Sequence, residues 1–189
     1  MNQETNEEIV FSGKIGEVVH TTQPDGRVFE RYRRAPGTRL VIITPDKKLI
    51  MTREHRQEIG NIDLRLPGGK VRDTLGEYHE LLESGKDIVA AASEAAAKEA
   101  SEEVGVTVTN LKLLTKATAG ATVEWDLYYF MTSDYQENAG GQNLEQGERI
   151  ERVELSAAEI RQAIKRGEMQ EWRSVGVLLG LVLPQLETA

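Results

Sequence analysis

The pattern of hydrophobic and polar positions predicts strands, a long helix, more strands and then helices. Residues 15–22 and 27–34 are expected to pair as strands, because the Gln-Pro-Asp-Gly sequence between them is a good hairpin turn. A second hairpin is expected across residues 45–47, and the run 124–132 is apolar enough to be a central strand. The other strands are expected at residues 39–44, 48–53, 64–66, 106–108, 111–116 and 150–154.

The expected helices lie in the middle and at the end of the chain. Residues 87–104 are expected to form one helix, whose alanine and aliphatic positions give it a packing side. A short amphipathic helix is expected at residues 75–83, and a last helix at about 170–186. Ser156 and Glu159 form a capping box for a helix that begins near residue 157.

Two polar stretches are expected to lack regular structure. Residues 1–8 are predicted to be disordered, and residues 133–148 to form a mobile loop. Strands on both sides of one central helix, followed by helices, predict an α+β fold, an α/β/α sandwich with a mixed central sheet. We expect residues 1–36 to form an N-terminal antiparallel extension and residues 37–189 to form the main domain.

Three glutamates in the expected long helix are the strongest chemical signal. Glu99, Glu102 and Glu103 stand at i, i+3 and i+4, which places their carboxylates on one face of a helix, where they repel one another. A divalent cation that prefers oxygen ligands would offset this repulsion, so the spacing indicates a metal site. A solvated acidic surface is the alternative interpretation. Upstream, the Pro-Gly-Gly sequence at 67–69 is expected to make a tight turn whose bare backbone approaches a ligand or offers a carbonyl.

Composition excludes several classes of protein. The 189 residues suit one domain with a sizeable core, and the net charge of −8 argues against a nucleic-acid polymer or an anionic membrane as partner. The sequence has no apolar run long enough for a transmembrane helix, and its polar, acidic start is unlike a signal peptide. It contains no cysteine, which excludes disulfides and thiolate chemistry. We expect a cytoplasmic location.

Arginines gather around two aromatic residues near the N-terminus. Guanidinium groups match the oxygens of phosphate, and aromatic rings stack on bases, so the group indicates a site for a phosphate and a base. Phe29, Arg31 and Arg34 are the candidates for substrate binding; exposed strand residues are the alternative. The group is too short to hold a polymer. It consists of Arg27, Arg31, Arg33, Arg34 and Arg39, with Phe29 and Tyr32 among them.

The order of glycine turn, glutamate helix, glycine and strand resembles the Nudix hydrolase signature. The second half of the family motif, Arg-Glu-aliphatic-x-Glu-Glu-x-Gly-aliphatic, matches residues 98–106 with Lys98 in place of arginine. The first half departs from the pattern, because Ala90 stands where the family has glutamate and Ser84 where it has glycine. The chain therefore resembles a Nudix box with an insertion at roughly residues 72–86.

Segments outside the motif are similar to the branch of the family that acts on ADP-ribose and nucleoside diphosphate sugars. The branch usually has a proline shortly after the box, and residues 115–121 have none, which leaves the sugar open. The resemblance implies hydrolysis of the diphosphate linkage, with Mg²⁺ or Mn²⁺, to a nucleoside monophosphate and a sugar phosphate. The similar segments are residues 33–37, 40–43, 49–56, 64–69 and 148–159.

The resemblance also implies roles for particular residues. Glu99, Glu102, Glu103 and the carbonyl of Gly68 would ligate the metal, and Lys98 would hold a box glutamate, with an ordinary surface ion pair as the alternative. The general base of this branch comes from the late loop. Here that makes Glu145 or Glu148 a candidate, alongside Glu102 as a further catalytic candidate.

The substrate and a partner subunit are also implied. Arg53 and Arg56 end a strand near the box and are expected to reach phosphate oxygens, with the resemblance favouring Arg56, while Glu124 is the candidate for contact with the sugar. The N-terminal sheet would help to form a homodimer and the base pocket. Three other functions stay open: cleavage of a nucleoside triphosphate or dinucleotide polyphosphate, a non-catalytic nucleotide sensor, and a purely structural or partner-binding role.

Overall fold

The computed structural model describes residues 6–56 and 60–188, and its centre is a mixed sheet. Strand β10 runs parallel to β4, and the other neighbours are antiparallel. This arrangement confirms the predicted mixed sheet and the central position of the run before residue 132. The strands follow in the order β12 (Ile150–Leu155), β5 (Leu49–Arg56), β4 (Gly37–Ile43), β10 (Leu127–Thr132) and β8 (Lys112–Ala117), and β6 (Asn61–Arg65) also pairs with β5.

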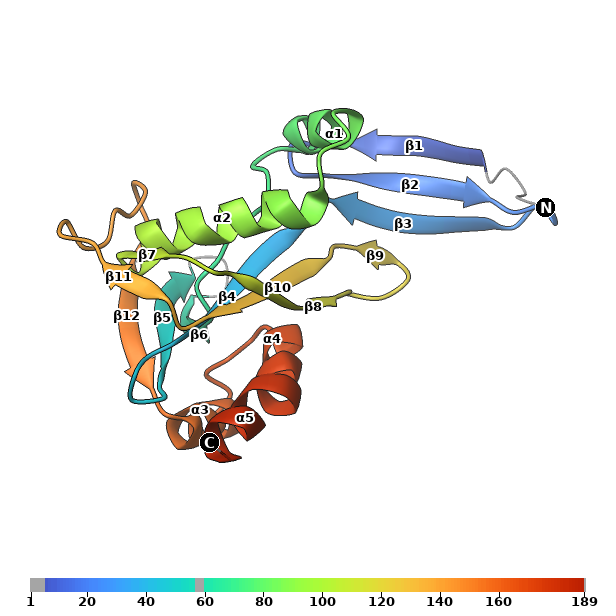
Figure 1. Ribbon diagram of the computed structural model, residues 1–189. Coiled ribbons are helices and arrows are strands. Elements are labelled where there is room, and N and C mark those ends of the chain that lie inside the picture. The colour runs from blue at the N-terminus through green and yellow to red at the C-terminus, as the bar shows by residue number, and fades with distance from the viewer. Residues whose placement is uncertain (1–5, 57–59, 189) are drawn as a thin grey trace.

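Alternating side chains of the central strands build a core on each face of the sheet. Leu40 and Ile42 of β4 pack beneath α2 (Ile88–Glu103), whereas Val41 between them packs against the C-terminal helices. Successive strand residues point to opposite faces, so a strand covered on both faces is apolar throughout. Figure 1 shows α2 on one side of the sheet and α3 (Ala157–Lys165), α4 (Trp172–Val177) and α5 (Leu183–Thr188) on the other. The α+β fold with α/β/α layers is confirmed.

A second sheet extends from one end of the molecule. It has the order β1 (Asn6–Ser12), β2 (Gly16–Thr22), β3 (Val28–Arg34) and β9 (Val123–Glu124), and Figure 1 shows it projecting beside the main body. The predicted hairpin is the antiparallel pair β2–β3. The prediction of disorder is wrong for residues 6–8, because they pair with β2 as part of the edge strand of this sheet. Residues 1–5 lie outside the described part of the chain.

Two predictions about the middle of the chain need correction. The expected single strand 124–132 is divided, because β9 joins the N-terminal sheet and β10 the central sheet. The expected loop 133–148 contains a strand, β11 (Tyr135–Glu137), which pairs with β7 (Val106–Val108). In both cases the partner strand is distant in sequence, so local polarity did not reveal the pairing.

Capping side chains mark where the helices begin, and the predicted capping box of Ser156 and Glu159 is present at α3. Thr74 caps α1 (Leu75–Glu83) through a capping box with Glu77, and Asp87 caps α2. The last predicted helix is wrong as a continuous α-helix: α4 is followed by the π-helix Leu178–Val182 and then by α5. These wider turns precede Pro184, which has no N–H to donate to the carbonyl four residues earlier.

Candidate active site

The glycine turn before α1 and the glutamate face of α2 lie against one another. The backbone N–H of Gly68 donates a hydrogen bond of 2.8 Å to Glu103 Oε2. A Cβ at Gly69 would lie 1.8 Å from Glu99 Oε1, so only glycine lets that carboxylate rest on the turn. Gly68 has a φ of +143° and lies against the Thr38 carbonyl, which would be 2.3 Å from a Cβ there. The expected close approach of bare backbone is therefore present, with the box carboxylates as its neighbours.

Burial makes the ionised forms of both carboxyls costly in the metal-free protein. Burial, together with the nearby charge of Glu99, raises the pKa of Glu103 to about 8. Burial also raises the pKa of Glu99 to about 7, and the Glu102 carboxylate adds to that shift. These two side chains are not a solvated acidic surface. They form a desolvated pair of oxygen donors that a cation would stabilise.

Glu102 occupies a different environment on the same helix. Its Oε2 accepts a 2.9 Å hydrogen bond from Lys98 Nζ, one turn earlier. Lys98 is 63% exposed, so this ion pair contributes little stability, on the order of ~0.3–0.5 kcal/mol for such a helical pair. The pairing predicted between Lys98 and a box glutamate is present.

These residues line one large cleft of about 550 Å³. Its volume is in the range of small-molecule sites. The cleft combines an acidic wall from α2 with several cationic side chains, which is the charge distribution that a metal-bound, polyanionic ligand requires. The charged lining residues are Arg34, Arg39, Glu54, Arg56, Arg65, Lys70, Arg72, Asp73, Glu77, Glu94, Lys98, Glu99, Glu102, Glu103, Glu145 and Glu148.

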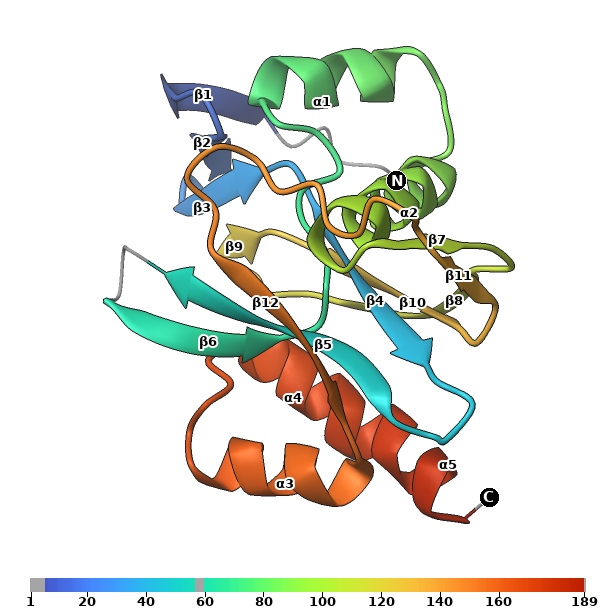
Figure 2. The ribbon, with the colours of Figure 1, turned by 90° about the vertical axis from the view of Figure 1, so that its left-hand side faces the viewer.

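The late loop is fastened to the C-terminal end of α2 and brings two glutamates to the cleft. Asn143 N–H donates 2.9 Å to the Glu102 carbonyl, and the Gln142 side chain donates to the Glu103 carbonyl. Figure 2 shows this loop passing in front of α2 on its way to β12. Glu145 and Glu148 both line the cleft, and the Glu145 N–H donates 2.9 Å to Glu148 Oε2. The end of the loop that was expected to be mobile is thus hydrogen-bonded to the part of α2 that carries Glu102 and Glu103.

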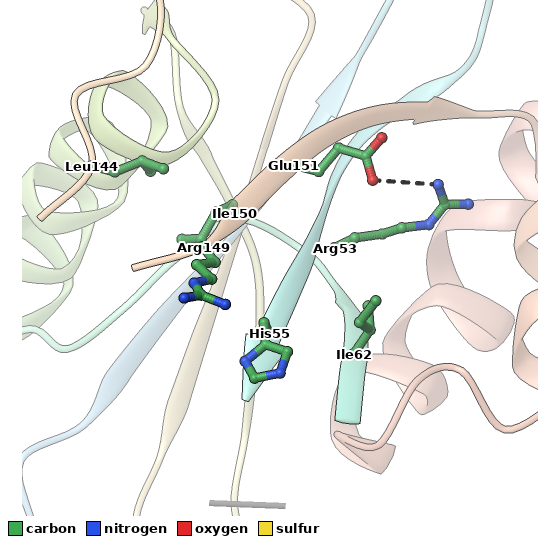
Figure 3. A pocket seen from close by; sticks show the side chains of 7 residues that line it. All are labelled: Arg53, His55, Ile62, Leu144, Arg149, Ile150 and Glu151. Carbon is green, nitrogen blue, oxygen red and sulfur yellow. Dashed lines mark ion pairs between the residues drawn. The ribbon is translucent and has the colours of Figure 1, made fainter. Parts of the chain in front are cut away.

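The structure separates the two arginines expected at the phosphates. Arg56 lines the cleft and donates 2.6 Å to Glu54. Arg53 points to a different, open hollow of about 410 Å³, where it pairs with Glu151 at 3.6 Å (Figure 3). Successive strand residues have opposite directions, so Arg53 and Arg56, three apart on β5, face different sides. The preference for Arg56 agrees with this placement.

The N-terminal candidates are also divided. Arg34 lines the cleft, with its guanidinium 4.5 Å from the Trp125 ring centre. Phe29 is 50% exposed on β3, and Arg31 pairs with Glu7 and, at 3.4 Å, with Glu124. Phe29, Arg31 and Glu124 therefore belong to the N-terminal sheet and do not line this cleft within one chain.

Two cleft residues, Trp125 and Arg65, were not named from the sequence, and Arg39 was named only as one of the N-terminal arginines. Arg39 is 4% exposed at the start of β4, and Trp125 lies between the divided strands. Arg65 donates 2.7 Å to Glu54, which joins β6 to the β5 side of the cleft. Arg39 belongs to the arginine group that indicated a phosphate site, but its burial in the cleft of the glutamates had no signal in the sequence.

The donor set fits a hard divalent cation. Glu99 and Glu103 offer only oxygen, are desolvated and repel each other. In residues 6–56 and 60–188, no three acidic or histidine side chains lie in a group that could hold a metal ion, and Glu102 is paired with Lys98. The pair Glu99 and Glu103 would hold the ion, with Glu102 available when it leaves Lys98.

Comparison with known proteins agrees with this site. The NUDIX domain profile matches residues 33–175, so the chain belongs to the Nudix family of hydrolases. Nudix hydrolases generally use divalent metal ions. A solved structure described as an ADP compounds hydrolase is similar over 97% of this chain and 92% of its own, with a TM-score of 0.67 and 22% sequence identity, a likeness that shows the fold. The comparison with curated proteins gave no match. Within residues 6–56 and 60–188, no helix has the length and hydrophobicity of a membrane span.

Proposed function

We propose that this Nudix hydrolase cleaves the diphosphate linkage of ADP-ribose or another nucleoside diphosphate sugar with Mg²⁺ or Mn²⁺. The products would be a nucleoside monophosphate and a sugar phosphate. The observation that carries the proposal is the buried pair Glu99 and Glu103 against the glycine turn, in a cleft that also presents arginines. The likeness to a protein described as an ADP compounds hydrolase supports the choice of substrate class.

Different residues of the cleft would bind the metal, bind the phosphates and accept a proton in such a reaction. Glu99 and Glu103, with Glu102 and the Gly68 carbonyl, would hold the metal, which supplies charge neutralisation and a more acidic bound water. Arg56 and Arg34 would bind phosphate oxygens, because guanidinium forks match them. Glu145 or Glu148 would accept the proton of the attacking water, from a loop held at the end of α2.

Residues 72–86 would contribute to the same cleft. Arg72, Asp73 and Glu77 line it at the start of α1. We interpret this segment as an insertion in the Nudix box that forms one side of the substrate site.

The N-terminal extension, residues 1–36, would form a homodimer. Phe11 is 60% exposed and Ile9 51% exposed on β1, and Phe29 is 50% exposed on β3. A group of large apolar side chains at one sheet is typical of a protein–protein interface. A second copy that covers this sheet would also bring Phe29 and Arg31 toward a substrate base, the role expected for them.

A substrate screen tests the proposed function. The protein is incubated with ADP-ribose, other nucleoside diphosphate sugars, nucleoside triphosphates and dinucleotide polyphosphates, with Mg²⁺ or Mn²⁺ and with EDTA as control. Products are separated by chromatography. Metal-dependent release of a nucleoside monophosphate from a diphosphate sugar is expected. Release of pyrophosphate from triphosphates alone, or tight nucleotide binding without turnover, contradicts the proposal.

A further inference from the structure

Arg39 is a buried cation in the lining of the cleft. Its side chain is 4% exposed and lines the cleft together with the metal-binding glutamates. Nη1 donates a 2.7 Å hydrogen bond to the Thr38 carbonyl, and Nε has no hydrogen-bond partner. In residues 6–56 and 60–188, no carboxylate forms a salt bridge with it. Most of its donors are therefore without a charged acceptor.

Two partly buried arginines, Arg65 and Arg33, have the carboxylate partner that Arg39 lacks. Arg65, 13% exposed, donates 2.7 Å to Glu54 Oε2, and Arg33, 22% exposed, donates 2.7 Å to Glu17 Oε1. Desolvating a guanidinium without a hydrogen-bonded anion is expensive, and a buried polar group without a partner requires an explanation. Arg39 remains a cation at neutral pH, since burial lowers its pKa only to about 10.

The backbone of Arg39 lies beside the turn that meets the box glutamates. A Cβ at Gly68 would be 3.0 Å from Arg39 Cα, and the Thr38 N–H donates 2.9 Å to the Gly69 carbonyl. Gly68 in turn holds Glu103. The unpaired guanidinium and the acidic pair thus belong to two walls of one cleft. A ligand with two linked anionic groups matches this arrangement, because one group would face the metal and the other the guanidinium.

We propose that Arg39 binds non-bridging oxygens of the substrate's diphosphate, as an anion receptor in addition to Arg34 and Arg56. The inference rests on the proposed function for the identity of the substrate, but not for the binding of an anion. Pyrophosphate, which contains the linked phosphoryl groups alone, is therefore the probe.

The opposing account is that Arg39 serves only the fold, as a counter-charge for the buried Glu103. The two accounts predict different behaviour of Arg39→Met, which keeps the length of the side chain and removes its charge. If Arg39 is an anion receptor, Arg39→Met loses affinity for pyrophosphate. Its Mg²⁺ affinity stays the same or rises, because a cation near the metal site has been removed. If Arg39 is only a counter-charge, Arg39→Met lowers Mg²⁺ affinity, because Glu103 loses the cation that supports it and is displaced.

The experiment measures pyrophosphate binding calorimetrically with the metal-free protein in EDTA, and Mg²⁺ binding separately. Arg161→Met is the matched control, since Arg161 pairs with Glu187 on the C-terminal helices. We expect Arg39→Met to weaken pyrophosphate binding about tenfold or more, and Arg161→Met to have no effect. Wild-type pyrophosphate affinity in Arg39→Met overturns the proposal, and so does a loss of Mg²⁺ affinity that equals the loss of pyrophosphate affinity.

A second variant covers the case in which Arg39→Met does not fold. Arg39→Lys keeps the charge but replaces the planar fork by a point charge, so pyrophosphate affinity is expected to fall by about threefold or more. Unchanged affinity in Arg39→Lys then overturns the proposal. If pyrophosphate binding depends on Arg39 but no nucleoside diphosphate sugar is cleaved, the proposed function fails while the anion receptor stands.

Discussion

The N–H of Gly68 donates a 2.8 Å hydrogen bond to the carboxylate of Glu103, 35 residues further along the chain. This contact joins the strand side of the cleft to the helix that supplies the acidic residues. A Cβ at Gly69 would collide with Glu99 in the same place. The positions of the Glu99 and Glu103 carboxylates thus depend on the two glycines of the turn, which have no side chain.

Removing one carboxylate of the pair is expected to abolish turnover and preserve the fold. Glu103→Gln retains the size of the side chain and loses the charge that would bind the cation. We expect kcat to fall by about 10³-fold or more, which corresponds to about 4 kcal/mol of transition-state stabilisation. The metal-dependent rate and a thermal melt measure both effects. Glu83→Gln, at an exposed position of α1, is the control; an unchanged rate in Glu103→Gln refutes the metal assignment.

Adding one methyl group at the turn is expected to separate activity from stability. In Gly69→Ala the new Cβ displaces the end of the flexible Glu99 side chain, while the backbone there needs no positive φ. We expect kcat/KM to fall about a hundredfold and the free energy of unfolding to change by less than about 1 kcal/mol. Gly140→Ala, where a Cβ meets open space, should leave both unchanged. Wild-type activity in Gly69→Ala would contradict the close approach of Glu99 to the turn.

The metal-free protein is expected to lose stability as the pH rises. The pKa of Glu103 is raised from 4.5 to about 8 by burial, so the folded state binds this proton more tightly than the unfolded state. Its contribution to the free energy of unfolding therefore decreases as the pH rises from about 4.5 to about 8. Thermal melts in EDTA across this range measure the slope. Glu103→Gln should reduce this slope, and added Mg²⁺ should counteract the loss of stability at higher pH. Equal slopes in wild type and variant argue against the raised pKa of Glu103.

The late loop is expected to supply the general base. Glu148→Gln and Glu145→Gln are compared, because both side chains line the cleft. The variant that removes the base should lower kcat by about a hundredfold or more, with Mg²⁺ affinity unchanged. The pH profile of kcat should lose its acidic limb in that variant alone. If neither substitution lowers kcat, the base lies elsewhere, and Glu102 becomes the candidate.

The N-terminal sheet is expected to mediate dimer formation. Phe11→Glu places a charge on a side chain that is 60% exposed on β1, and burying this charge in an interface would be costly. We expect the variant to elute as a monomer and the wild type as a dimer, as measured by light scattering. Leu181→Glu, at a 41% exposed position of the C-terminal helices, is the control. A monomeric wild-type protein would show that the sheet has another role.

Sequence alone determined the elements whose signals are local. The spacing of Glu99, Glu102 and Glu103, the Pro-Gly-Gly turn and the caps at Ser156 and Glu159 each depend on neighbours within a few residues. The layers of the fold followed as well, because strands covered on both faces are apolar throughout.

Only the tertiary structure decided which charges share one cleft. Arg39 and Arg53 are both candidates for a phosphate contact in the sequence, yet Arg39 lies buried in the cleft of the glutamates and Arg53 pairs with Glu151 in a separate hollow. The pairing of β1, the division of β9 from β10 and the anchoring of the late loop likewise depend on partners far along the chain. Such contacts are set by the packing of the whole chain, which the hydrophobic pattern of one segment does not contain.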